Sequence, residues 1–322
     1  MWRIKFSEQA TIAASGKKQF RTEVAALGNL NHVNLVQLRG FCAEGTRRLL
    51  VYEYMENGSL DRWIFRNNPI ATGDKNEDQS RTLPWEIRYR IAVDMARGLA
   101  FLHEGSRDKV VHLDVKPQNL LLDANFRAKL ADFGLCKLIN REGENNQTMT
   151  AMRGTPGYMA PEWFLNLPIT EKSDVFSYGM VLLELVGGRK NLNLAMGSED
   201  GWYFPAWAVK QAENGDIMSV IDKQLLEEVK DNYGVATESM KKLIHVAFWC
   251  IQENPSSRPA MSTILLMLEQ HLEVPEPPLE LTYVVGRQSR PHPSNTNSTA
   301  STFTKKLIFS RVEESISLLE PR

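Results

Sequence analysis

Apolar residues recur at helical spacing near the start of the chain. Ser15, a residue type that often caps helix N-termini, comes just before them. The spacing predicts a helix of about three turns that carries Glu23. The apolar positions are Phe20, Val24, Leu27 and Leu30.

Two apolar stretches then follow, residues 35–41 and 48–55, with the turn-like residues 43–46 between them. Two short apolar runs joined by a turn containing glycine predict a β-hairpin. Residues 66–82 are polar and predict an exposed loop. Pro84 then stands where a helix can begin. The apolar face of that helix would comprise Ile91, Met95, Leu99 and Leu102.

From Ser173 onward the pattern is mainly helical, and residues 175–185 are apolar enough to form a buried core helix. A strand-rich beginning followed by a helical body predicts an α+β architecture with two lobes. Residues 274–322 are rich in Pro, Ser, Thr and Asn, and this composition predicts a disordered tail.

Composition narrows the choice of partners and compartment. With 322 residues, 43% of them hydrophobic, the chain can bury a large core. Its formal charge of -1 provides no positive electrostatic field that would attract nucleic acid. Three cysteines without metal-ligand spacing suit a reducing compartment, so we expect a cytoplasmic location. No apolar run is long enough to span a bilayer, and no membrane span is expected in this chain.

Four polar residues have the types and spacing that phosphoryl transfer requires. Asp114 follows an apolar run at residues 109–111 and could accept a hydroxyl proton, and Lys116 could reach a phosphoryl group. Asn119 and Asp132 offer oxygen atoms of the kind that Mg²⁺ prefers. Asp132 would follow a hairpin formed by residues 120–130. We therefore expect a phosphoryl-transfer site that uses nucleotide phosphates and Mg²⁺.

The order of the sequence motifs makes the functional prediction more specific. Residues 112–119 read His-Leu-Asp-Val-Lys-Pro-Gln-Asn, followed by Asp-Phe-Gly at 132–134 and Ala-Pro-Glu at 160–162. Together with residues 31–36, 49–60 and 154–163, they resemble the cytoplasmic kinase domain of plant receptor-like serine/threonine kinases. The resemblance is greatest to the S-domain (G-type lectin) group and covers residues 15–273.

The resemblance implies a bilobal protein-kinase fold with an incomplete β lobe and a mainly α-helical C-terminal lobe. Residues 1–57 would be the partial N-lobe and residues 58–273 the C-lobe, followed by the tail.

It also implies a nucleotide pocket. Tyr52 would be the gatekeeper, the backbone of Glu53 and Met55 would bind the adenine edge, and Leu121 would lie beneath the ring. The alternative for Tyr52 is simple strand packing. Glu23 would pair with a strand lysine, and its alternative is an ordinary solvated helix carboxylate.

Residues 132–162 would form the activation segment, with Thr148, Thr150 and Thr155 as candidate phosphoacceptors. For Thr155, a role in positioning Asp114 and the substrate is favoured over phosphorylation. Three further residues would have structural roles. These are Glu162 and Arg258, as an ion pair, and Asp174, as a brace for the catalytic loop.

The chain departs from the family's pattern at two places. Leu113 stands where many kinases have the arginine that contacts a phosphorylated activation segment, so switching through that arginine is not expected. No glycine-rich loop occurs before Glu23. Lys5 could be the remaining strand lysine, or it could be a plain exposed lysine, and weak ATP binding is expected without the loop.

Three functional hypotheses follow. The first is a serine/threonine kinase that transfers the γ-phosphate of ATP to protein hydroxyls in receptor-like kinase signalling, with receptor or signalling partners. The second is a pseudokinase or scaffold, favoured by the missing loop. The third is a truncated gene model of an active kinase, whose true product has the missing strands.

Overall fold

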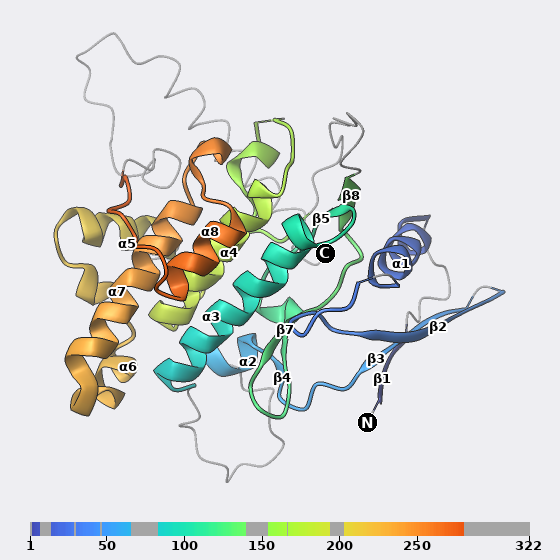
Figure 1. Cartoon of the computed structure of the whole chain (residues 1–322), viewed down its shortest axis with the longest axis horizontal. Helices are drawn as coiled ribbons and strands as arrows, with labels where there is room; N and C mark the ends of the chain where they lie inside the picture. The colour runs from blue at the N-terminus through green and yellow to red at the C-terminus, as the bar shows by residue number, and fades with distance from the viewer. Residues whose placement is uncertain are drawn as a thin grey trace. The chain divides into compact units, whose positions relative to one another are not determined.

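The computed structural model describes residues 2–6, 14–28, 30–45, 47–65, 83–139, 154–165, 167–193 and 203–279, with the backbone alone for residues 2–6, 14 and 15. The chain divides into two compact units. The first unit combines residues 1–145 with 260–273, and the second combines residues 146–259 with 274–322. Strands and helices both occur, so the predicted α+β class is confirmed (Figure 1).

The described strands all lie in the first unit. They are β1 (Trp2–Phe6), β2 (Leu38–Glu44), β3 (Arg47–Glu53), β4 (Gly58–Ser59), β5 (Lys109–Val111), β6 (Leu120–Leu122), β7 (Ala128–Leu130) and β8 (Lys137–Ile139). The helices of this unit are α1 (Ala14–Leu27), α2 (Asp61–Ile64), α3 (Trp85–Ala100) and α8 (Met261–Leu268), with a π-helical turn at Phe101–Gly105 and a 3₁₀ turn at Pro117–Asn119.

The described part of the second unit is helical apart from an isolated bridge between Leu192 and Tyr203. Its helices are α4 (Lys172–Gly187), α5 (Phe204–Glu213), α6 (Lys223–Glu228) and α7 (Tyr233–Cys250). Short 3₁₀ turns occur at Pro161–Trp163, Ile217–Val220, Lys230–Asn232 and Pro255–Ser257.

The first sheet has the strand order β1-β3-β2, with both pairings antiparallel. Strands β2 and β3 form the hairpin that the apolar pattern predicted. Gly45 has a positive φ of 53° at the turn, a conformation that glycine adopts without a Cβ penalty. β1 adds to the other edge of β3, where the backbone of Lys5 pairs with that of Leu50.

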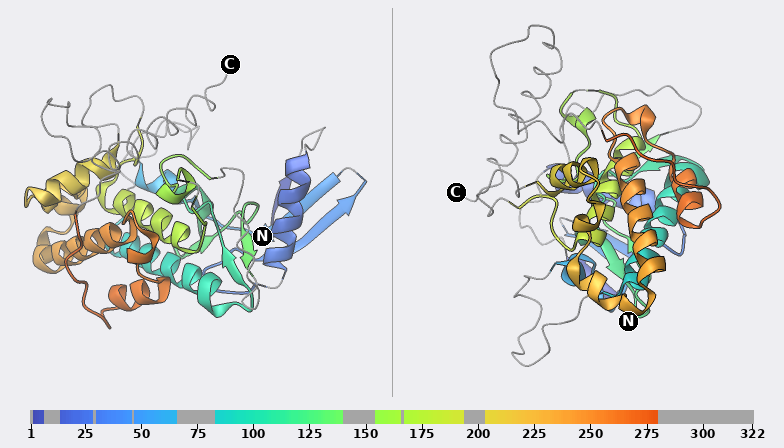
Figure 2. Two further views of the ribbon diagram at one scale, coloured as in Figure 1. Left: turned by 90° about the horizontal axis from the view of Figure 1, so that it is seen from above. Right: turned by 90° about the vertical axis from the view of Figure 1, so that its left-hand side faces the viewer.

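Helix α1 lies beside this sheet (Figure 2). The ring of Phe20 meets that of Phe41 on β2 edge to face, with centroids 6.2 Å apart, which is a favoured aromatic geometry. The helix was predicted to begin after Ser15, but it begins at Ala14, so Ser15 is inside the helix and the capping prediction is wrong. The predicted position of Glu23 on this helix is confirmed.

The predicted hairpin at residues 120–130 is also present. β6 pairs antiparallel with β7 in the sheet β4-β6-β7, and β5 pairs with β8 in a separate two-stranded sheet. The loop from residue 112 to residue 119 therefore runs between β5 and β6, and residues 131–136 run between β7 and β8. Two short loops that each leave a strand thus carry the candidate catalytic residues.

Helix α3 buries the predicted apolar face, because Ile91, Met95 and Leu99 are at most 1% exposed. The same helix carries Asp94, which is fully buried. The carboxylate of Asp94 accepts hydrogen bonds from the Arg127 side chain and the Ala128 backbone N–H. A buried carboxylate that is paired in this way fixes β7 against α3.

Helix α4 is the core of the second unit, as the apolar run at 175–185 predicted. All its residues from Ser173 to Gly187 are buried. It packs against α7 at Gly179, where an added Cβ would lie 2.6 Å from the Cβ of Cys250. Only glycine permits so close an approach of the two helices.

Candidate active site

The loop between β5 and β6 holds three of the predicted residues together. Asp114 Oδ2 lies 2.8 Å from Lys116 Nζ and 2.9 Å from Asn119 Nδ2. Asn119 Nδ2 also donates to the backbone carbonyl of Asp114 at 2.9 Å. A cation and an amide therefore hold the Asp114 carboxylate in one orientation. A carboxylate that accepts a proton from a substrate hydroxyl must be oriented in this way.

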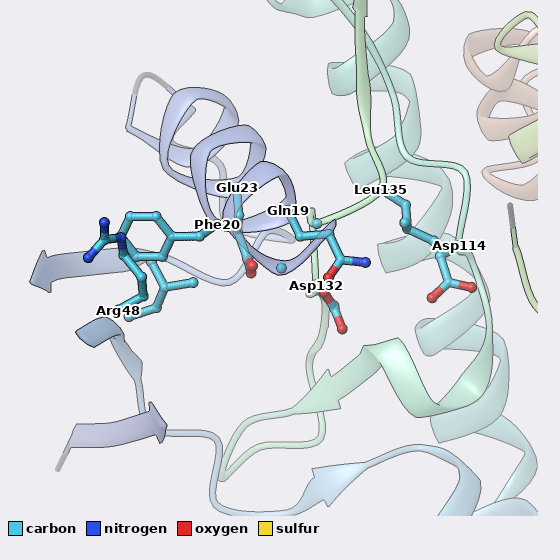
Figure 3. A pocket seen from close by; sticks show the side chains of 10 residues that line it. Gln19, Phe20, Glu23, Arg48, Asp114, Asp132 and Leu135 are labelled. Carbon is cyan, nitrogen blue, oxygen red and sulfur yellow. The ribbon is translucent and has the colours of Figure 1, made fainter. Parts of the chain in front are cut away.

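A cavity of about 240 Å³ joins this loop to other elements of the first unit (Figure 3). Asp114, Asp132 and Glu23 all line it, and they come from the loop after β5, the loop after β7 and helix α1. The other lining residues are Gly16, Gln19, Phe20, Arg48, Leu50, Gly134 and Leu135. Three carboxylates far apart in sequence thus face one space.

Glu23 is 4% exposed, and its carboxylate accepts a hydrogen bond from the Tyr52 hydroxyl. The alternative of a solvated helix carboxylate is therefore wrong. Burial raises the pKa of Tyr52, and the nearby carboxylates of Glu23 and Asp132 raise it further. Tyr52 consequently remains a neutral donor that ties β3 to α1.

The two candidate loops each contain a residue in the left-handed backbone region. Leu113 has a φ of 67° and Asp132 a φ of 65°. Such conformations cost non-glycine residues about 1–2 kcal/mol and are enriched at active sites. His112 supports both loops, because its ring nitrogens contact the Asp114 N–H and the Ala131 carbonyl, and its ring packs edge to face on Phe133.

The donor set fits Mg²⁺. Among the described residues, no group of three or more His, Cys, Asp or Glu side chains could enclose a metal. A cation at this site would therefore need ligands from a bound phosphate as well, which is the usual mode for Mg²⁺. The amide of Asn119 turns its nitrogen to Asp114, so its oxygen points away from that carboxylate and can serve as a ligand.

The segment from Tyr52 to Met55 connects β3 to the rest of the first unit. The Glu53 carboxylate accepts from Lys129 Nζ at 2.8 Å and from the Gln37 N–H at 2.9 Å. Lys129 pairs with Leu121 across β6 and β7. Glu53, Met55 and Leu121 do not line the 240 Å³ cavity, so their contact with adenine stays a prediction.

Sequence comparison decides the family. The model of the family described as "Protein kinase domain" matches residues 1–268. The chain belongs to the protein kinase family. The resemblance to a protein kinase domain that was inferred from the motifs is therefore confirmed, and the catalytic role of the loop that carries Asp114 stays a prediction.

Named relatives refine the comparison. The chain is 48% identical over 267 residues to the G-type lectin S-receptor-like serine/threonine-protein kinase SD2-5 of Arabidopsis thaliana. The aligned residues cover 83% of this chain and 30% of that protein. The chain is 46% identical over 271 residues to the protein of the same description named SD2-2, which is 82% of this chain and 32% of that protein. A probable receptor-like protein kinase of A. thaliana, At5g20050, is 44% identical over 270 residues, 82% of this chain and 58% of that protein.

The chain thus spans about a third of the length of the first two relatives. Among its described residues, no helix has the length and apolar character needed to cross a membrane. A protein kinase domain implies phosphotransfer that depends on ATP and acts on protein substrates.

Several predicted residues are only partly accounted for. The backbone of Lys5 pairs with Leu50, which lines the cavity, but its side chain is outside the described part, so its pairing with Glu23 stays a prediction. Thr148 and Thr150 also lie outside the described residues. Thr155 lies in the second unit, where its carbonyl accepts from the Tyr158 N–H, and its role toward Asp114 stays a prediction.

In the second unit, Glu162 and Arg258 form a bidentate ion pair with both N···O distances at 2.8 Å. Both side chains are at most 1% exposed. Arg258 also donates to the carbonyl of Gln252, and its guanidinium lies 5.1 Å from the ring centroid of Phe176. Asp174 is fully buried in the first turn of α4, and its brace role stays a prediction.

Some residues of the site were not predicted. Gln19 lines the cavity one helical turn before Glu23, so the helical spacing on α1 could have indicated it. Lys129 forms the ion pair with Glu53, but it lies 76 residues away in sequence, and no local pattern indicates that partner. Arg48 reaches the cavity from β3. The alternation of side chains along a strand predicts on which face of the sheet Arg48 lies, but it does not predict which residues surround it there.

Proposed function

We propose that this chain is the catalytic domain of a serine/threonine protein kinase that transfers the γ-phosphate of ATP to protein hydroxyls. One observation carries the proposal. Asp114, held by Lys116 and Asn119, shares a cavity with Asp132 and Glu23. The relatives' names, which describe serine/threonine-protein kinases, support the choice of acceptor.

Each residue has a distinct role in this proposal. Asp114 accepts the proton of the substrate hydroxyl while the hydroxyl oxygen forms its bond to the γ-phosphorus and ADP leaves. Lys116 places a positive charge beside that carboxylate, 2.8 Å away, where phosphate oxygens would become more negative. Asn119 and Asp132 would hold Mg²⁺, which neutralises charge on the nucleotide phosphates.

The remaining roles follow from the family pattern. The backbone of Glu53 and Met55 would bind adenine, with Tyr52 behind the ring and Leu121 below it. Lys5 would contact phosphate and pair with Glu23, and its register opposite Leu50 supports this because Leu50 lines the cavity. By analogy with the receptor-like relatives, we propose a cytoplasmic domain with receptor or signalling partners.

A phosphorylation assay with radiolabelled ATP, Mg²⁺ and casein as a general protein substrate tests the proposal. Asp114→Asn should lower the turnover rate by about 10²- to 10⁴-fold, because the amide cannot accept the proton. Asp231→Asn removes a carboxylate from an exposed position and serves as the matched control. Equal activity of the two variants, or no activity in the unsubstituted chain, would overturn the proposal.

A further inference from the structure

A proline-rich segment follows helix α8. We call residues 274–279, Val-Pro-Glu-Pro-Pro-Leu, the proline strap. Proline fixes its own φ near -65° and restricts the residue before it to extended conformations. Val274, Glu276 and Pro277 each precede a proline, so nearly every residue of the strap is confined to an extended or polyproline II backbone before it touches anything.

Two side chains of α7 and the turn after it hold the strap by its carbonyl groups. Trp249 Nε1 donates to the Pro275 carbonyl at 2.9 Å, and Gln252 Nε2 donates to the Pro278 carbonyl at 3.0 Å. Pro275 and Pro278 are three positions apart, which is one turn of a polyproline II helix, so their carbonyls point the same way. Trp249 is in the last turn of α7 and Gln252 follows the end of that helix, so both donors come from the same end of α7.

His245 lies one helical turn before Trp249 on α7, and the negative charge of the strap residue Glu276 influences its pKa. Burial lowers the pKa of His245, and the negative charges of Glu276 and Glu238 act in the opposite direction.

Gln252 connects this surface to the buried ion pair. Its side chain is 6% exposed and donates to the Phe248 carbonyl as well as to Pro278. Its own carbonyl accepts from Arg258 Nε at 2.7 Å, and Arg258 holds Glu162. Gln252 is therefore buried and held in one orientation by hydrogen bonds of its side chain and its backbone. Its amide is preorganised to donate to a ligand carbonyl, unlike a flexible surface amide.

We propose that the surface formed by Trp249 and Gln252 is a docking site for a proline-rich segment with the pattern Pro-x-Pro-Pro, and that the chain's own proline strap occupies it. Aromatic and amide donors that reach the carbonyls of a preformed polyproline II helix are a general way of binding such segments. Little conformational entropy is lost on docking, because the prolines have already restricted the free segment.

The indole N–H of Trp249 provides a direct probe in the full-length chain. Its hydrogen-exchange rate can be measured by ¹⁵N NMR, and its signal is assigned among seven tryptophans by its loss in Trp249→Phe. Replacing Pro275, Pro277 and Pro278 together by glycine keeps every carbonyl acceptor but frees the backbone. Exchange should become about tenfold faster or more.

Two further variants make the result specific. Pro277→Gly alone, at a carbonyl that neither Trp249 nor Gln252 uses, should accelerate exchange by about two- to fivefold. Pro291→Gly with Pro293→Gly makes the same change beyond the strap and should leave the rate unchanged. Unchanged exchange in both strap variants, or equal acceleration in the Pro291 and Pro293 control, would overturn the proposal.

The site can also be tested with a separate ligand. The peptide Val-Pro-Glu-Pro-Pro-Leu, added at millimolar concentration to the triple glycine variant, should slow the exchange of the Trp249 indole in a saturable way. The same peptide with alanine in place of proline should not. If neither peptide slows exchange, or if both do so equally, the surface does not recognise proline-rich segments and the proposal fails.

Discussion

The buried ion pair of Glu162 and Arg258 gives a quantitative prediction for stability. Both side chains are at most 1% exposed, and Arg258 donates to both Glu162 oxygens and to the carbonyls of Gln252, Lys172 and Glu253. In Arg258→Met, the side chain keeps much of its volume but the Glu162 carboxylate loses its cation. Leaving a buried charge unpaired costs about 3–5 kcal/mol, so the free energy of unfolding should fall by that amount.

A double substitution separates the charge from the packing. Glu162→Leu combined with Arg258→Met removes both charges, so no unpaired charge is buried. This variant should regain at least about 2 kcal/mol relative to Arg258→Met alone. The free energy of unfolding is measured by urea titration with circular dichroism and linear extrapolation.

The exposed pair of Lys241 and Glu238, with an N···O distance of 3.9 Å and exposed fractions of 38% and 72%, is the matched control. Lys241→Met should change the free energy of unfolding by less than about 1 kcal/mol. If the double variant is no more stable than Arg258→Met, the unpaired charge is not the cause of the loss. The explanation would then have to be sought in the lost carbonyl contacts.

Three further changes test other parts of the structure. Gly179→Ala should destabilise the chain by about 1–3 kcal/mol because its Cβ would collide with Cys250. The control is Gly234→Ala on α7, where no atom lies within 4 Å of the added Cβ, and it should be neutral or stabilising by up to about 1 kcal/mol. Thermal unfolding compares the two variants, and equal shifts of the melting temperature would refute the close approach of α4 and α7. Tyr52 has a pKa raised above its ordinary value of 10.0, so the folded state holds this proton more tightly, and the stability it contributes is present below pH 10 and lost as pH rises above it. We therefore expect the free energy of unfolding, measured by urea titration between pH 8 and pH 11, to fall more in the unsubstituted chain than in Tyr52→Phe. The difference should grow by about 1.4 kcal/mol for each pH unit above 10. An equal fall in the free energy of unfolding of both proteins would contradict this. Asp132→Asn should raise the Mg²⁺ concentration needed for half-maximal kinase activity at least about tenfold, and an unchanged Mg²⁺ requirement would show that Asp132 is not a ligand.

The elements with strong local patterns could be predicted from the sequence. The hairpin of β2 and β3 was predicted from two apolar runs and a glycine turn, and α3 from apolar residues that repeat at helical spacing. The grouping of Asp114, Lys116 and Asn119 could be predicted because they lie within six consecutive residues, so their spacing alone brings them together.

Contacts between distant segments could not be predicted in this way. The partner of Glu53 is Lys129, and the partner of the Glu23 carboxylate is Tyr52, and in each case both residues have ordinary local surroundings in sequence. Composition predicted a disordered tail from residue 274 onward, whereas Pro275 and Pro278 accept hydrogen bonds from Trp249 and Gln252. Proline content indicates how stiff such a segment is but does not indicate which surface it meets.

The positive φ at Leu113 has a consequence for which side chains the catalytic loop can accept. At a φ of 67°, a side chain branched at Cβ is strained, whereas an unbranched side chain is better tolerated whatever its charge. Leucine and the arginine common in other kinases are both unbranched at Cβ, so the family can exchange one for the other without moving the backbone of Asp114. In a saturation library at this position, variants should therefore sort by branching at Cβ, with valine, isoleucine and proline depleted and both arginine and leucine retained.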